Sequence, residues 1–151
     1  MIKIYRTDDC SIHEEENIQE GVWVQMVQPS RSEAMHIDDV KAALDVEESS
    51  RIELESGYTL ILVDIPTEEV RHEKRVYTTI PLGIILMQNM IITICTEDTP
   101  ILHRFVKGRV REFSTKKKMR FVYQILFHVA SLYQADLRVL DKKRISIEER
   151  I

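Results

Sequence analysis

Glycine and proline are scarce in this sequence, with four residues of each type among 151. The glycines are not clustered, which excludes the glycine-rich loop that binds phosphates in many nucleotide-binding proteins. The sequence also lacks a Gly-x-Ser-x-Gly turn and a His-Glu-x-x-His pair, the signatures of serine hydrolases and zinc proteases. Since no nucleophile can be paired with a base, we predict that the chain is not an enzyme.

Cysteine is rarer still, with only Cys10 and Cys95. Two cysteines are too few for a disulfide framework, and these two are too far apart for a close-spaced metal pair, so a reducing compartment fits best. Each is expected to be a small buried hydrophobe or an idle thiol. The N-terminal segment MIKIYRTDDC has no apolar signal-peptide core, so nothing directs this region out of the cytoplasm.

One long stretch, residues 76–96, carries no charge. Its length would allow a helix to cross a bilayer. Pro81, Gly83 and the polar pair Gln88-Asn89 argue against a membrane helix, and β-branched residues dominate the flanks. We therefore predict two short buried strands joined by a tight turn.

Charge is unevenly distributed along the chain. The net charge of −4 does not favour a general nucleic-acid binder, although residues 104–120 carry eight Lys and Arg against Glu112 alone. Such a stretch can meet nucleic-acid phosphates or anionic lipid headgroups, but it is more commonly the solvated face of a helix pair. We expect no nucleic-acid partner and keep binding through 104–120 as an alternative.

The order of the predicted elements indicates an α+β fold. Alternating or continuous apolar residues predict strands at 1–5, 21–29, 51–55 and 58–66, with a Ser56-Gly57 turn and a polar loop or hairpin tip at 67–75. A capping box formed by Ser30 and Glu33 starts a helix. We expect a mixed or antiparallel sheet sandwiched by helices.

The last third of the chain changes to helical periodicity. Thr99 and Pro100 start a helix predicted to reach about Phe113, and a basic break precedes a long helix from about Lys117 to the C-terminus. The row Leu126, Tyr133, Leu140 and Ile147 repeats every seven residues, which is typical of a helix-packing seam. We predict a sheet domain at 1–98 and a helical hairpin at 99–151, packed together as one soluble unit.

The most chemically suggestive stretch is DVEESSR. It contains three carboxylates within four positions, at Asp45, Glu47 and Glu48. Carboxylate oxygens are ligands that suit Mg²⁺. The alternative is a solvated polar loop. His36 and Asp39 share a helix face, but this spacing often arises by chance, and His128 is expected to be a core or interface histidine.

Four collinear blocks resemble the N-terminal cytoplasmic domain of CorA-type magnesium transporters: GVWVQMVQPS, AALDVEESSRIELESGYTLILVDIP, IPLGIILMQNMIITICTED and VLDKKRISIEERI. The resemblance implies a homopentamer in the cell membrane, with this region on the cytoplasmic side and a long stalk helix leading to the pore. The family's Gly-Met-Asn motif and spanning helices are missing from this sequence. We therefore expect a domain truncated before the membrane helices.

The resemblance also implies regulation, in which Mg²⁺ bound between neighbouring subunits holds the closed state. The family's acidic positions fall at Ala42, Ala130 and Gln134, which are not carboxylates. We expect sensing to have moved to nearby acids, or this member to be gated differently. Transport of another divalent ion, such as Zn²⁺ or Co²⁺, remains open. The candidate metal ligands are Asp45, Glu47, Glu48, Asp136 and Asp141.

Overall fold

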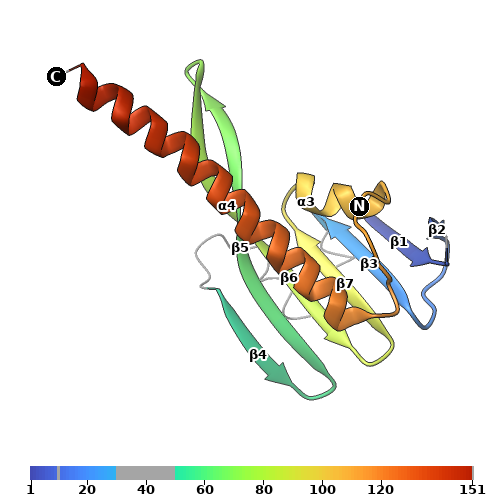
Figure 1. Cartoon of the computed structure of the whole chain (residues 1–151). Coiled ribbons are helices and arrows are strands. Elements are labelled where there is room, and N and C mark those ends of the chain that lie inside the picture. The colour runs from blue at the N-terminus through green and yellow to red at the C-terminus, as the bar shows by residue number, and fades with distance from the viewer. Residues whose placement is uncertain (10, 30–49, 151) are drawn as a thin grey trace.

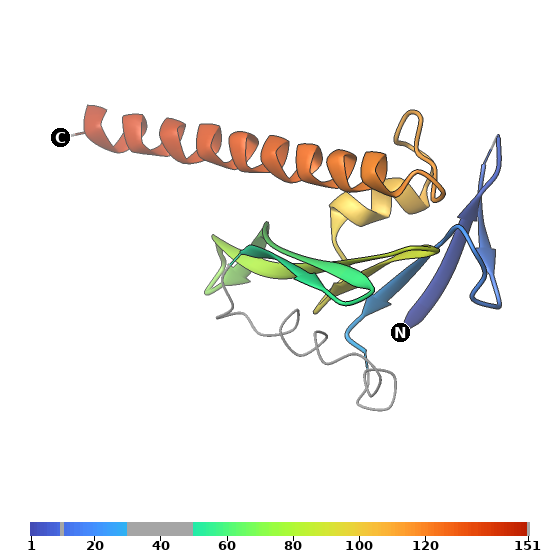
Figure 2. The ribbon, with the colours of Figure 1, turned by 90° about the horizontal axis from the view of Figure 1, so that it is seen from below.

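The protein folds as one seven-stranded sheet with helices α3 and α4 over the same face (Figures 1 and 2). The computed structural model describes residues 1–9, 11–29 and 50–150. The strand order is β2-β1-β3-β7-β6-β5-β4. The elements are β1 (Ile2–Thr7), β2 (Ile12–Glu15), β3 (Val22–Val27), β4 (Arg51–Glu55), β5 (Tyr58–Arg71), β6 (Lys74–Met87), β7 (Met90–Cys95), α3 (Pro100–Val106) and α4 (Lys118–Glu149).

The predicted mixed sheet is confirmed. β3 and β7 are parallel at its centre, while the other neighbouring strands are antiparallel. All six residues of β3 are buried, as expected for a strand covered on both faces. The predicted helix that starts at Ser30 lies outside the described residues, so the expected second helical layer stays a prediction.

The uncharged stretch forms a hairpin, as predicted. β6 and β7 pair through Leu86 and Ile91 across the Gln88-Asn89 turn. Pro81, which has no N–H, lies opposite Asp64 in the β5–β6 ladder. Within the described residues, no helix has both the length and the hydropathy needed to cross a membrane.

Of the two alternatives predicted for 67–75, the hairpin tip is confirmed and the polar loop is wrong, and only two of these residues form the turn. β5 and β6 continue outward until Arg71 pairs with Lys74. His72 and Glu73 have φ values of +50° and +64°, the left-handed conformation that a two-residue type I′ turn requires. The ion pair between Arg71 and Glu69, 2.7 Å long, lies near this turn. The charged residues on both sides of this turn therefore belong to the strands of a long hairpin.

Helix α3 is shorter than predicted. Thr99 caps its N-terminus by accepting the Leu102 N–H at 3.1 Å, as expected, but the helix ends at Val106 instead of about Phe113. The reason is Gly108, which has a φ of +67°. Its N–H donates to the Phe105 carbonyl, and the Arg109 N–H donates to the Arg104 carbonyl, which together form a Schellman motif.

The core beneath the helices is rich in aromatic rings. Trp23 is fully buried, and its ring centroid lies 4.9 Å from that of Phe121 and 6.5 Å from that of Phe105. Its indole N–H donates to the Thr93 hydroxyl at 2.9 Å. Cys95 is also buried, as expected, and burial raises the pKa of its thiol to about 11. This cluster joins β3, β7, α3 and α4.

A threonine pair fastens the loop before α4 to the first strand. The Thr7 N–H donates to the Thr115 hydroxyl at 3.1 Å, and the Thr115 N–H donates to the Thr7 hydroxyl at 2.9 Å. The Thr115 hydroxyl also donates to the Gly21 carbonyl at 2.7 Å. Both threonines are buried, so each hydroxyl satisfies backbone groups that water cannot reach.

Candidate functional site on the long helix

Helix α4 is the most extended element of the protein. Its 32 residues correspond to a rod of about 48 Å at 1.5 Å per residue. It contains neither glycine nor proline, which explains why no residue interrupts it. The predicted start near Lys117 is confirmed, since Lys117 is the N-cap residue.

The first half of α4 is rooted in the core. Phe121, Val122, Ile125 and Val129 are buried, and their spacing places them along one face of the helix. Leu132 and Tyr133 pack against the same cluster. Of the predicted seven-residue row, only Tyr133 joins this core, while Leu126, Leu140 and Ile147 are exposed. Leu140 and Ile147 point in the same direction around the helix as the buried residues 18 positions earlier, so they are exposed because they lie beyond the core.

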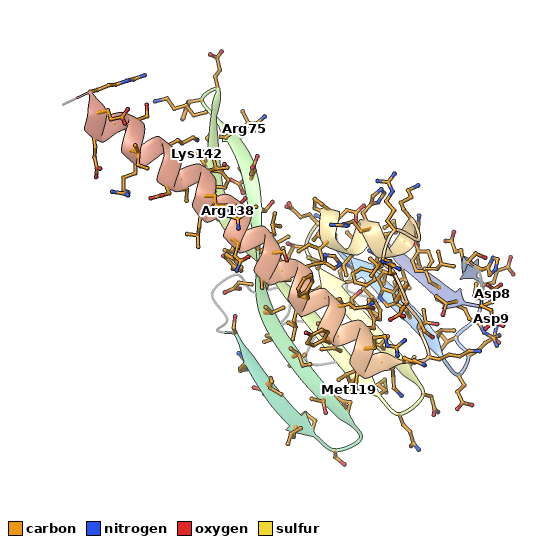
Figure 3. All side chains as sticks on the ribbon, viewed as in Figure 1. Asp8, Asp9, Arg75, Met119, Arg138 and Lys142 are labelled. Carbon is orange, nitrogen blue, oxygen red and sulfur yellow. The ribbon has the colours of Figure 1, made fainter. Side chains whose placement is uncertain are left out.

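The second half of α4 projects away from the sheet domain and runs beside the β5–β6 hairpin (Figure 1). Every residue from 137 to 150 is exposed. The Tyr133 hydroxyl donates to the Asp64 carbonyl at 2.9 Å, and the Lys143 ammonium lies 5.6 Å from the centre of the Tyr77 ring. Figure 3 shows Arg75 of the hairpin close in view to Arg138 and Lys142 of the helix.

Asp136 is the more buried of the two candidate ligands on α4. Burial, followed by the nearby charge of Glu68, raises the pKa of its carboxyl group. A bound cation would reverse this effect by favouring the carboxylate. Asp136 is therefore a half-buried acid near the exposed Glu68, where α4 passes the hairpin.

Asp141 is already engaged in ion pairs. Its Oδ1 accepts hydrogen bonds from Nε and Nη2 of Arg144 at 3.1 and 2.9 Å, and Arg144 also donates to Glu148 at 2.9 Å. All three side chains are largely exposed, so such pairs contribute little stability. A metal ion would have to compete with Arg144 for this carboxylate.

The structure does not bring together the two candidate ligands that it describes, both of which lie on α4. Asp136 and Asp141 are five residues apart, which on a helix separates them by about 140° around the axis and about 7.5 Å along it. Among the described residues, no three His, Cys, Asp or Glu side chains are grouped to hold a metal ion. Asp45, Glu47, Glu48 and Ala42 lie outside these residues, and their role stays a prediction.

Ala130 and Gln134 are both exposed on α4, and their four-residue spacing puts them on one face. Phe127 and Leu137, exposed by 59% and 63%, flank them on this face. This face therefore carries no charge between positions 127 and 137, where the resemblance led us to expect acids, and Asp141 lies on the same face one turn further along. This exposed face can be predicted from helical spacing that starts at Ala130, whereas the seven-residue row follows a different face of the helix.

Solved structures share this fold. The complete CorA magnesium transporter from Methanocaldococcus jannaschii matches with a TM-score of 0.75 and 17% identity, covering 99% of this chain and 50% of that chain. The soluble domain of CorA from the same organism matches with a TM-score of 0.76 and 19% identity, covering 99% of this chain and 64% of that chain. This chain thus spans about half to two thirds of those lengths.

The cytoplasmic domain of ZntB from Vibrio parahaemolyticus is also similar, with a TM-score of 0.68 and 11% identity over 93% of this chain and 62% of that chain. At these identities the likeness concerns the fold alone. No curated protein sequence matches the chain. The family model described as CorA-like Mg²⁺ transporter protein matches residues 19–151. Since this match covers most of the sequence, the chain belongs to the CorA-like Mg²⁺ transporter family.

Proposed function

We propose that this chain is the regulatory domain of a divalent-cation transporter, lying on the cytoplasmic side of the cell membrane and sensing Mg²⁺. The observation that carries the proposal is α4, which is rooted in the core at one end and exposed along its second half. Family membership supports transport rather than enzymatic catalysis. The ZntB relative, described as a cytoplasmic domain, supports the location.

The shape of α4 suits it to pass movement from the sheet domain to a distant pore. Its buried residues end at Val129, and Glu149 lies 20 residues, or about 30 Å, further along the helix. A tilt of about 5° of the buried part would displace the far end by about 3 Å over that length. A small rearrangement around the domain is thereby enlarged at the end of the helix.

Mg²⁺ would act by bridging carboxylates between neighbouring subunits of a homopentamer. Crowded carboxylates repel one another without the cation, and an ion shifts a conformational equilibrium only by its different affinity for the two states. Asp136 and Asp141 face different sides of α4, so in a ring they would face different neighbours. Asp45, Glu47 and Glu48 are the proposed partners of these two side chains. The exposed apolar face around Phe127 and Leu137 supports self-association.

The test measures thermal unfolding and sedimentation of this chain with 0 to about 10 mM Mg²⁺, a range suited to weakly held, hydrated ions. We expect Mg²⁺ to raise the melting temperature or promote association, because an ion that binds only the folded or assembled state stabilises that state. Asp45→Ala combined with Glu48→Ala should reduce the response. Parallel titrations with Zn²⁺ and Co²⁺ distinguish the preferred ion.

The matched control is Glu14→Ala combined with Glu16→Ala, which removes the same charge from two exposed residues in and directly after the edge strand β2. This control should keep the full Mg²⁺ response. If the unmutated chain responds to none of the three ions, the sensing role is wrong and only the family and the fold stand.

A further inference from the structure

A hollow lies where α4 begins, at the opposite end of this helix from its exposed half. Its volume is about 450 Å³, which is within the range of small-molecule sites. Several separate segments supply its walls: β1, the segment before β3, the β6–β7 turn and the start of α4. The lining residues are Arg6, Gln19, Glu20, Gly21, Gln88, Asn89, Lys116 and Lys118.

The walls are held in place by hydrogen bonds between these segments. The Gly21 N–H donates to the Asn89 carbonyl at 2.7 Å, and the Gly21 carbonyl accepts from Thr115 at 2.7 Å. Gly21 has a φ of +81°, and a Cβ at this position would lie 3.1 Å from Cγ of Lys116. Glycine is favoured here because of this left-handed φ, and its lack of a side chain also leaves room for Lys116.

The hollow carries more positive than negative charge. Arg6, Lys116 and Lys118 line it against the single carboxylate of Glu20. Within residues 1–9, 11–29 and 50–150, neither Arg6 nor Lys116 has an ion-pair partner. Arg6 is nevertheless half-buried. A partly desolvated guanidinium without a counter-charge is unfavourable, and a bound anion would correct this.

Neutral donors surround these cations. Gln19, Gln88 and Asn89 line the same hollow and can each donate two amide hydrogens. The Lys118 ammonium donates to the Gln88 carbonyl, which places its charge at the β6–β7 turn. The N-terminus of α4 has no side-chain cap and no acidic residue in its first turn, so its free N–H groups add to the positive potential.

We propose that this hollow binds a soluble, phosphate-bearing small molecule. A phosphate group offers several charged oxygens, which three converging cations can share, and Arg is especially suited to bidentate phosphate binding. The volume leaves room for an organic group beyond a phosphate or diphosphate. A lipid headgroup has the same chemistry, but the hollow lies about 48 Å from the far end of α4. The preference for a soluble ligand rests on the proposed function, in which the membrane lies beyond that end.

The experiment is a calorimetric titration of this chain with ADP and with inorganic pyrophosphate, in EDTA so that no divalent ion contributes. We expect saturable binding of both. Arg6→Ala and Lys116→Ala should each weaken the affinity about tenfold, the typical effect of losing a hydrogen bond to a charged group. Glu20→Gln should strengthen binding, because it removes the one carboxylate from the lining. Unchanged circular dichroism shows that each variant is folded.

The control variant, Lys107→Ala combined with Arg109→Ala, removes two exposed cations from the same basic segment that do not line the hollow. It should bind as tightly as the unmutated chain. No binding of either probe, or an equal loss in the control variant, would overturn the proposal. Stronger binding to phosphatidylglycerol vesicles than to ADP, lost in Arg6→Ala, would overturn the soluble ligand. An intact Mg²⁺ response in Arg6→Ala separates this site from cation sensing.

Discussion

The two halves of α4 are one continuous helix in two different environments. The first half buries Phe121, Val122, Ile125 and Val129 in the core, while the second half is exposed from residue 137 onward. Helical hydrogen bonds alone therefore do not fix the position of α4, since both halves have them. Burial of the first half fixes its direction, and the second half follows because the rod is stiff.

The largest expected effect comes from the rooted half. Phe121→Ala removes a fully buried ring that lies within 5 Å of the ring centroids of Trp23, Phe105 and Phe113. The lost burial and the cavity left behind should lower the free energy of unfolding by about 3–5 kcal/mol. Urea denaturation measures the change.

Leu140→Ala is the matched truncation in the exposed half, where the side chain is 43% exposed. It should change the free energy of unfolding by about 0.5 kcal/mol or less. Similar losses in the two variants would contradict the division of α4 into a rooted half and a free half.

A smaller effect is expected at the boundary between the halves. Tyr133→Phe removes the hydroxyl that donates to the Asp64 carbonyl of β5. The expected loss is about 1 kcal/mol, as for one hydrogen bond. Amide exchange should become faster around Tyr133 and in the neighbouring part of β5. The control is Tyr123→Phe, in which the ring is 71% exposed; equal exchange rates in both variants would rule out a role for this bond.

The smallest effect concerns pH. Because the pKa of Asp136 is raised in the folded protein, folding favours its protonated form, and this stability is lost as the pH rises through the folded pKa. Asp136→Asn should therefore stabilise the protein slightly at pH 7, by less than about 0.5 kcal/mol, and the gain should vanish near pH 3.5. Urea denaturation at the two pH values measures this difference.

Asp141→Asn provides the comparison, because it removes an ion pair with Arg144 and should be neutral or slightly destabilising at pH 7. A stabilisation by Asp141→Asn equal to that of Asp136→Asn would show that general surface charge, rather than the local surroundings of Asp136, is responsible.

The features that could be predicted from the sequence are those that depend on residues close together along the chain. The Thr99 cap, the Ser56-Gly57 turn and the strands on both sides of Gln88-Asn89 were readable from local patterns. Strand β2 and the outer part of the β5–β6 hairpin were missed, because their charged residues resemble loop sequence and only pairing with a partner strand stabilises them. The end of α3 is also a local feature, because Gly108 forms the Schellman motif there.

The candidate site was less predictable because its contacts join distant residues. The bond between Tyr133 and Asp64 spans 69 positions, and no local pattern indicates which strand passes beneath a helix. The separation of Asp136 from Asp141 around α4, in contrast, follows from their spacing alone. The hollow at the start of α4 is partly lined by the uncharged residues Gln88, Asn89 and Gly21. These residues also come together only after the sheet has formed.

The reciprocal bonds between Thr7 and Thr115 have a consequence for the order of folding. They connect positions 108 residues apart, so the entropy of closing that loop must be overcome before they can form. We therefore expect the loop that leads into α4 to become fixed late, after the first strand has joined the sheet. Helix α4 can form its own hydrogen bonds before that step, but it would acquire its final direction only in the finished domain.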